Sequence, residues 1–163
     1  MLRRKIWFKM DAIWKNSSLI AQTQLLVRSL KHWTGRELLA GHFAPEMLAE
    51  KLFHAPFVVV SHGTEADPVL NYGNAAALAL WEMPWAELTR TPSRLTAEAP
   101  NRAERARLLA AVTARGFIDD YSGVRISKSG RHFCVAQATV WNLVSSNGKP
   151  CGQAAMFSHW EFL

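Results

Sequence analysis

The last third of the chain has the pattern of three consecutive β-strands joined by tight turns. Strand-forming residues run from Phe117 to Ser127, from His132 to Val144 and from Cys151 to Trp160. Lys128-Ser129-Gly130 and Asn147-Gly148 separate these runs, and Gly and Asn favour the short turns of hairpins. The sequence therefore predicts an antiparallel three-stranded meander.

The middle run of the meander alternates in a way that predicts two apolar faces. Residues two apart in a strand lie on the same side of a sheet. Alternation predicts one face of bulky side chains, made of Phe133, Val135, Trp141 and Leu143. The other face is predicted to carry smaller apolar side chains, those of Cys134, Ala136, Ala138 and Val140.

Two shorter strands and several helices precede the meander. The β-branched run 57–62 predicts a buried strand, and 69–72, after the Asp67-Pro68 turn, predicts its hairpin partner. Polar residues then predict helix starts: Asn74 before an alanine-rich helix, and Asn101, with Glu104 three residues on, before a longer helix that ends at Gly116. Pro84 and Pro92 divide the intervening segment into one-turn helices and loops.

Two amphipathic helices are predicted ahead of the first strand. Ser17 or Ser18 is a natural N-cap for a helix with an apolar stripe from Leu19 to Trp33, which ends near Gly35. A second helix spans 44–53, with Pro45 in its first turn. The predicted division is a basic amphipathic extension over 1–16, N-terminal helices over 17–54 and a main domain over 55–163.

The first 16 residues differ chemically from the rest. They contain five Lys and Arg residues and one Asp, with Ile6, Met10 and Ile13 at helical spacing. This pattern is typical of a helix that lies on an anionic membrane or docks on a partner. Two alternatives stay open: a disordered basic extension, or a start at Met10 in place of Met1.

Composition limits the class of protein. A chain of 163 residues with 49% hydrophobic and 20% charged residues has the composition of one globular domain. The formal net charge of +6 allows a nucleic-acid or anionic-membrane partner without requiring one. Its apolar runs are too short to span a membrane, so we expect a cytoplasmic protein. Two cysteines are too few for a disulfide framework, and phosphate-loop, dinucleotide, nucleophile-elbow and metal motifs are missing from the sequence.

The order of the predicted elements and several long words identify a resemblance. The predicted order of elements is that of a PAS domain: two strands, a short helix, one-turn helices, a longer helix and a meander. The words 57–68, 71–74, 92–95 and 121–131 resemble the MEKHLA domain, a PAS-related family found in stand-alone bacterial proteins and at the C-terminus of plant class III homeodomain leucine-zipper transcription factors. The resemblance covers about 18–160 and implies an α+β fold: a five-stranded antiparallel sheet with helices on one face, preceded by an N-terminal helical extension.

The resemblance implies a sensory or interaction domain and supplies no catalytic residues. In light-sensing flavin-binding PAS domains a reactive cysteine stands where this chain has Ser93, which disfavours cysteinyl-flavin photochemistry. Oxygen-sensing haem-binding PAS domains use a histidine on the longer helix, and 101–115 contains none. Haem held in that way is disfavoured as well, and the cofactor stays unknown.

Candidate ligand-binding residues are polar groups at strand ends and large aromatics on strands. His62 is predicted either to enter a pocket or to lie at the surface; Arg94 and Arg125 suit a carboxylate or phosphate, or else pair with nearby acids. Aromatics line pockets of this kind or simply pack in the core. The full candidate set is His62, Asn71, Trp81, Arg94, Tyr121, Arg125, Trp141 and Trp160.

Three functions remain after this reasoning. The first is a non-enzymatic signal-transduction module that binds a small ligand or a protein partner, as a homodimer through the Leu19–Trp33 helix or a sheet face. The second is a small enzyme in which His62 or Arg94 acts beside a bound carboxylate-bearing substrate. The third is a membrane- or nucleic-acid-associated protein that attaches through 1–16.

Overall fold

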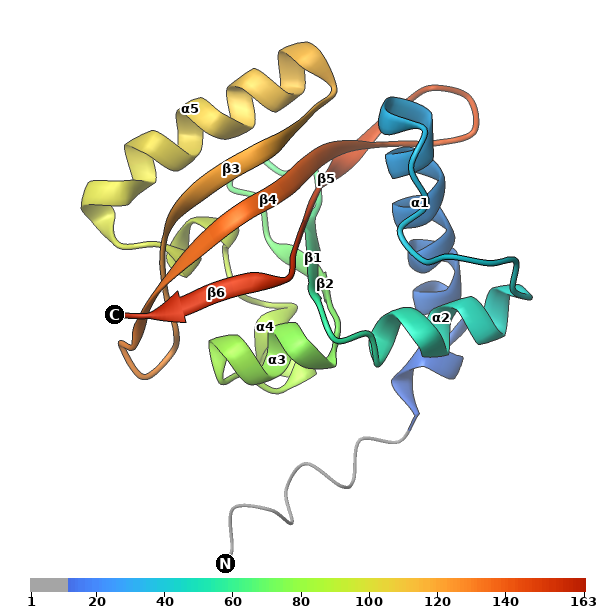
Figure 1. Cartoon of the computed structure of the whole chain (residues 1–163), viewed down its shortest axis with the longest axis horizontal. Helices are drawn as coiled ribbons and strands as arrows, with labels where there is room; N and C mark the ends of the chain where they lie inside the picture. The colour runs from blue at the N-terminus through green and yellow to red at the C-terminus, as the bar shows by residue number, and fades with distance from the viewer. Residues whose placement is uncertain (1–11) are drawn as a thin grey trace, which may run out of the picture.

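The fold is built on one antiparallel sheet, seen in a computed structural model that describes residues 12–163, with the backbone alone for 99–101. Five strands follow the order β2-β1-β5-β4-β3, and β6 pairs with β4 (Figure 1). The strands are β1 (Val58–His62), β2 (Leu70–Gly73), β3 (Phe117–Ile126), β4 (His132–Val144), β5 (Pro150–Phe157) and β6 (His159–Phe162). The predicted hairpin and meander are confirmed, and the class is α+β.

The sheet has one strand more than the sequence predicts. The expected last strand, 151–160, is divided at Ser158 into β5 and β6. Whereas β5 pairs with the second half of β4 and with β1, β6 pairs with residues 133–136 of β4. On the edge of β4 opposite β3, both halves of the strand are therefore paired.

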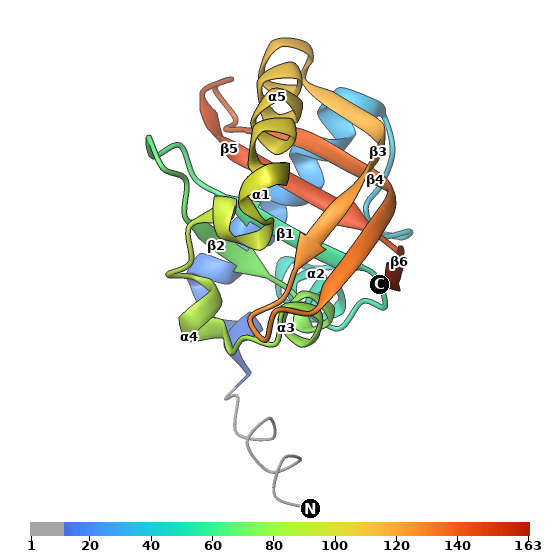
Figure 2. The same ribbon diagram turned by 90° about the vertical axis from the view of Figure 1, so that its left-hand side faces the viewer.

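Helices cover both faces of the sheet. One side carries the four helical elements that follow β2, namely α3 (Ala75–Trp81), α4 (Trp85–Leu88), the 3₁₀ helix η3 (Ser93–Thr96) and α5 (Ala99–Arg115). The elements that precede β1 are the 3₁₀ helix η2 (Ile13–Lys15), α1 (Ser17–Thr34) and α2 (Pro45–Phe53). Figure 2 shows α5 and α1 on opposite sides of the sheet.

Two hydrophobic clusters follow from this arrangement, one on each face. On the α1 side, Leu26 and Leu30 pack with Val59, Tyr72 and Trp141. The second cluster lies on the α3 side and is made of residues such as Val58, Leu78, Trp81, Phe133, Val135 and Phe157. Neighbouring residues of β1 thus belong to different clusters, as strand alternation requires.

The predicted alternation of β4 is wrong because the strand contains a bulge. Gln137 has a φ of 53°, and the register with β3 shifts between Tyr121 and Gly123. One extra residue reverses the alternation beyond it. Phe133 and Val135 consequently share a face with Ala138, whereas Trp141 lies on the other face.

Helix starts differ from the sequence prediction at two places. The N-cap of α1 is Asn16, whose side chain accepts a hydrogen bond from the Ser18 amide, so neither predicted serine caps the helix. The backbone of α5 becomes helical at Ala99, with Glu98 as the N-cap residue, three residues before the predicted N-cap Asn101. The predicted end of α1 at Gly35, with a φ of 71°, is confirmed.

The predicted cap of α3 is confirmed, and its residue also connects α3 to two other elements. Asn74 is fully buried and its side-chain oxygen accepts hydrogen bonds from the amides of Ala77 and Val59. The amide group donates to the carbonyls of Leu52 and Phe57. One side chain thereby ties α3 to the end of α2 and to the start of β1.

Candidate ligand-binding site

A cavity of about 70 Å³ lies between the sheet and the elements η3 and α5. On this measure one water needs about 10–15 Å³, so the cavity has room for a molecule of a few heavy atoms. Strands β1, β3, β4 and β5 supply its floor. Its apolar walls are formed by Val60, Leu70, Leu108, Leu109, Val135, Ala138, Val140, Ala155 and Phe157.

His62 ends β1 at the cavity and has only one satisfied ring nitrogen. The side chain is 8% exposed, Nδ1 lies 2.8 Å from the Gly63 carbonyl oxygen, and Nε2 has no hydrogen-bond partner. A neutral ring that donates from Nδ1 leaves a bare acceptor lone pair at Nε2. Burial, with a smaller contribution from Arg105, lowers the pKa of His62 below its usual 6.5, although the Gly63 carbonyl and Glu65 act in the opposite direction.

The backbone around His62 explains why this side chain is held at the cavity. Gly152 of β5 has a φ of 128°, and a Cβ there would clash with the His62 carbonyl oxygen. Only glycine combines that φ with such a close approach of two strands. His62 is therefore positioned by its neighbouring strand and not only by its own side-chain packing.

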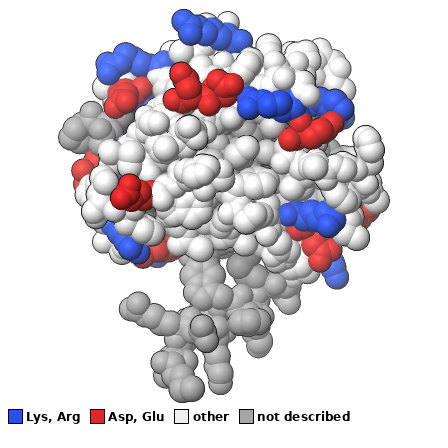
Figure 3. All heavy atoms as spheres, viewed as in Figure 1, with Lys and Arg blue, Asp and Glu red and all other residues white. Residues whose placement is uncertain are grey.

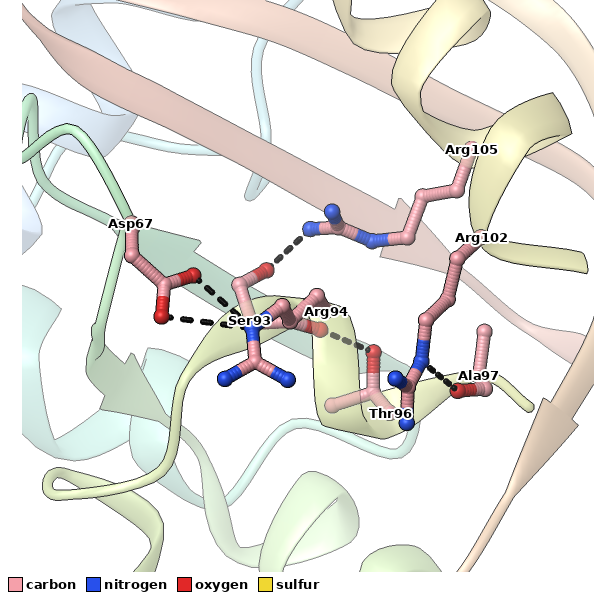
Figure 4. A network of polar contacts seen from close by, with 7 residues as sticks. All are labelled: Asp67, Ser93, Arg94, Thr96, Ala97, Arg102 and Arg105. Carbon is pink, nitrogen blue, oxygen red and sulfur yellow. Dashed lines mark hydrogen bonds and ion pairs between the residues drawn. The ribbon is translucent and has the colours of Figure 1, made fainter. Parts of the chain in front are cut away.

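Arg105 reaches the cavity from α5 and donates to the hydroxyl of Ser93 in η3 (Figure 4). It is partly buried, and burial followed by the positive charge of Arg125 lowers its pKa to about 10. The guanidinium therefore stays charged at neutral pH. Among the described residues, Arg105 forms no salt bridge, although the charge of Asp67 raises its pKa slightly.

A second arginine, Arg125 of β3, also lines the cavity. Its Nη2 donates to the Tyr121 hydroxyl at 2.6 Å, and Nη1 donates to the Val124 carbonyl. The guanidinium carbon also lies 5.1 Å from the centre of the Tyr121 ring. The cavity lining contains two guanidinium groups and no Asp or Glu.

Gln153 of β5 links the cavity to the second half of α5. Its amide nitrogen donates to the Leu109 carbonyl, to the Thr113 hydroxyl and to Asn142 Oδ1, each at 3.0 Å. Asn142 in turn donates to the Val112 carbonyl. This network fastens the second half of α5 to the sheet.

An outer groove of about 450 Å³ adjoins the cavity at the end of the sheet. Trp33, Thr64, Pro68, Thr113, Val144 and Pro150 are among its lining residues. His62 and Gln153 line both spaces. These two side chains, which are paired across β1 and β5, are therefore the partition between groove and cavity.

The structure brings four of the eight predicted site residues together. His62, Trp81, Tyr121 and Arg125 line the cavity. Trp81 is 3% exposed and its indole nitrogen has no hydrogen-bond partner, which makes it a further buried donor. Their role in ligand binding stays a prediction.

The other four predicted residues lie outside the cavity lining. Arg94 is exposed and its Nε lies 3.1 Å from Asp67 Oδ1, so it points away from Arg105 (Figure 4). Asn71 is exposed and accepts a hydrogen bond from the Ser61 hydroxyl. Trp141 is buried in the α1-side cluster, and Trp160 packs on Phe157, with ring centres 5.9 Å apart.

Sequence reasoning missed Arg105 and Gln153. Arg105 lies three, four and seven residues before Leu108, Leu109 and Val112, the stripe predicted to face the core. Helical spacing could therefore have placed Arg105 on the buried face. No sequence signal places Gln153, because its orientation depends on the register of β5 against β4.

The described residues provide neither a cluster of metal ligands nor a cysteine in the cavity lining. Within residues 12–163, no three His, Cys, Asp or Glu side chains are grouped to hold a metal ion. Ser93 lines the cavity where the reactive thiol of a light-sensing flavin-binding PAS domain would be expected. The chemistry of the site is that of two cations, one buried acceptor and apolar walls.

Comparison with known sequences decides the family. The sequence model of the MEKHLA domain matches residues 20–162. The chain belongs to the MEKHLA domain family. No curated protein matches this MEKHLA domain chain in sequence.

Solved structures similar to this MEKHLA domain share the PAS fold. The PAS domain of a protein from Colwellia psychrerythraea has a TM-score of 0.56 at 12% identity, over 72% of this chain and 95% of that chain. An RNA-binding light-oxygen-voltage receptor gives 0.60 at 15% identity, over 76% of this chain and 36% of that chain. A light-state dimer of the fungal photoreceptor Vivid gives 0.53 at 12%, over 79% and 88%. At these identities the likeness shows the fold.

The surface of the MEKHLA domain bears on its membrane and nucleic-acid alternatives. No helix within residues 12–163 is both long and apolar enough to cross a membrane. On the face shown in Figure 3, basic and acidic side chains lie beside one another around the rim. The predicted basic extension falls mostly on 1–11, outside the described residues, and its role stays a prediction.

Proposed function

We propose that this chain is a non-enzymatic sensory module that binds a small organic molecule in the cavity beneath α5. The observation that carries the proposal is the unpartnered Nε2 of His62, buried in the wall of the cavity. A buried acceptor without a partner is costly, and a ligand that donates to it removes that cost. The cavity also has the mixture expected of ligand sites, apolar walls with a few polar groups.

The contacts of the cavity walls suggest how occupancy reaches α1. Ser61 follows Val60 and precedes His62 on β1, and its hydroxyl accepts a hydrogen bond from Gln22 of α1 at 3.1 Å. Across the sheet, Gln153 donates to Asn142, whose carbonyl accepts from the Trp33 indole of α1 at 2.9 Å. Both connections join a residue at the cavity to the helix on the opposite face.

The mass of the protein as purified tests this function. We expect native mass spectrometry to show a reproducible non-covalent addition, accompanied by an absorption band if the ligand is a chromophore. Ala138→Leu, which fills the cavity from β4, is the control and should lack the addition. An unliganded wild-type protein, with α1 hydrogen exchange unaffected by any small molecule offered, would contradict the proposal.

The enzyme alternative has less support from the geometry. It requires His62 or Arg94 beside a carboxylate-bearing substrate. His62 lies in the cavity, but Arg94 is exposed and paired with Asp67. The two residues that this hypothesis names do not converge on one site.

A further inference from the structure

We infer that the cavity binds a small organic carboxylate, which Arg105 and Arg125 face and whose hydroxyl group donates to Nε2 of His62. This inference rests on the proposed function, since it names the class of ligand for the same cavity.

The charges around the cavity favour an anion. Arg105 and Arg125 belong to different elements and both line the cavity, whose lining contains no acidic side chain. Within the described part of the chain neither arginine forms a salt bridge; Arg105 donates to Ser93, and Arg125 to Tyr121 and a carbonyl. A guanidinium has five donors in a planar fork, so both groups keep donors for a carboxylate.

The mutual effect of the two cations also supports an anion between them. Burial and the charge of Arg125 both lower the pKa of Arg105, so these surroundings disfavour the charged guanidinium. A bound carboxylate reverses that repulsion and replaces lost hydration with charge-assisted hydrogen bonds. The Asp67 carboxylate offsets part of this repulsion, but its oxygens accept hydrogen bonds from Arg94 Nε, and it forms no salt bridge with Arg105.

His62 adds a requirement for a hydrogen-bond donor on the same molecule. The side chain is more than nine-tenths buried, and Nε2 has no partner. Since burial disfavours the charged imidazolium, the neutral ring presents an acceptor to the cavity. A hydroxyl group on the ligand satisfies this acceptor. An ammonium group could also donate to it, but would add a third positive charge close to the two arginines.

The apolar walls favour an organic carboxylate over inorganic phosphate. Leu108, Leu109 and Val135 are among the many aliphatic side chains that surround the polar groups. A phosphate ion has polar oxygens on every side, and those that face aliphatic groups lose water without a replacement. A carboxylate with a short aliphatic body places its polar end at the arginines and its carbon chain against these walls.

The experiment measures affinity for a matched series of small molecules by ligand-observed NMR and isothermal titration. The probes are the straight-chain carboxylates from acetate to hexanoate, their 2-hydroxy derivatives, the primary amides of both sets, and inorganic phosphate. We expect at least one hydroxy acid to bind about tenfold or more tightly than its amide, and more tightly than the acid without the hydroxyl.

Two arginine variants separate charge recognition from folding. Arg105→Met is expected to weaken hydroxy-acid binding by about 10- to 100-fold, because a charge-assisted contact is lost. Arg94→Met removes an exposed arginine of the same network and should leave the affinity unchanged. Arg105→Lys keeps the positive charge but lacks the planar guanidinium. Its affinity for the hydroxy acid should lie between those of wild type and Arg105→Met. His62→Phe should abolish the preference for the hydroxylated acid.

The outcomes distinguish this inference from the function on which it rests. Amides that bind as well as the acids, or phosphate that binds better than every acid, would overturn the carboxylate assignment while leaving a ligand-binding cavity. Equal binding by Arg105→Met and wild type would do the same. If no probe binds, the carboxylate inference is wrong, and the mass of the purified protein then decides whether the cavity holds a ligand of another class.

Discussion

The buried imidazole of His62 makes stability depend on pH in a defined direction. Burial is the main cause that lowers its pKa in the folded protein below 6.5, and the Arg105 charge lowers it further. The unfolded chain then binds more protons than the folded chain as pH falls through about 6.5, so stability decreases in that window and is regained on returning to higher pH.

A pair of histidine variants measures this dependence. Wild type should lose more unfolding free energy between pH 7.5 and 5.5 than His62→Gln, because the variant has no titrating ring at this site. Urea denaturation at the two pH values gives the comparison, with the exposed His42→Gln as control. An identical loss in wild type and His62→Gln would refute the assignment of this pH dependence to His62.

Asn74 is the second residue whose environment predicts a large effect. Its side chain makes four hydrogen bonds, two accepted and two donated, of which three are buried and the one to Phe57 is partly buried. Asn74→Ala leaves those backbone groups without partners, and we expect a loss of about 3 kcal/mol, against about 1 kcal/mol for Asn16→Ala, which removes only an exposed cap. Thermal and urea unfolding measure both; similar losses for the two variants would contradict this account.

The roles of Asn74 and Arg105 could be predicted from the sequence only where they depend on local structure. A helix cap is a local arrangement, so the role of Asn74 at the start of α3 could be predicted from its neighbours. Its contacts to Leu52 and Phe57 depend on how α2 meets β1. The orientation of Arg105 toward Ser93 likewise requires the packing of α5 over η3.

Among the elements, β4 shows best how a local irregularity determines which side chains meet. The bulge at Gln137 places Phe133 and Ala138 on the same face, whereas regular alternation separates them. Period-two reasoning predicted the strand and its length correctly, but it assigns every residue beyond an unrecognised bulge to the wrong face. No glycine marks this position, so the sequence contains no conventional sign of the bulge.

Substitution of Gln137 tests the bulge by the sign of its effect. The side chain is exposed and φ is positive, a conformation that costs a β-branched residue most. Gln137→Val should therefore destabilise the protein by about 1–2 kcal/mol, and Gln137→Gly should be neutral or stabilising. In a regular strand the order would be reversed, because valine is the better strand former. Urea denaturation of the two variants decides between these cases.

For the whole molecule, the packing of α1 bears on the predicted homodimer. The apolar stripe of α1 contacts the sheet within the same chain, and Leu26 has no exposed surface. The Leu19–Trp33 helix therefore offers little of that stripe to a second copy. The sheet-face alternative remains a proposal; one open site is the half-buried patch around Val124, Cys134 and Ala136 on β3 and β4.

Two substitutions separate folding from association. Leu26→Asp buries a charge in an apolar cluster and should cost roughly 4 kcal/mol or more, seen as loss of the cooperative melt, whereas exposed Arg28→Asp should be tolerated. Ala136→Arg should keep the melt and lower the mass in light scattering from dimer to monomer. A folded Leu26→Asp monomer would instead support association through α1.

Helix α1 is synthesised well before the strand on which it packs. Ser29 accepts a hydrogen bond from the amide of Val144 at 2.9 Å, and these residues are 115 positions apart. At roughly 5–20 residues per second of synthesis, about 6 to 23 seconds pass between the two. During that interval the apolar stripe of α1 has left the ribosome before its surface on β4 exists. A nascent chain of this protein therefore has no sheet surface on which to bury that stripe until the last strands have been synthesised.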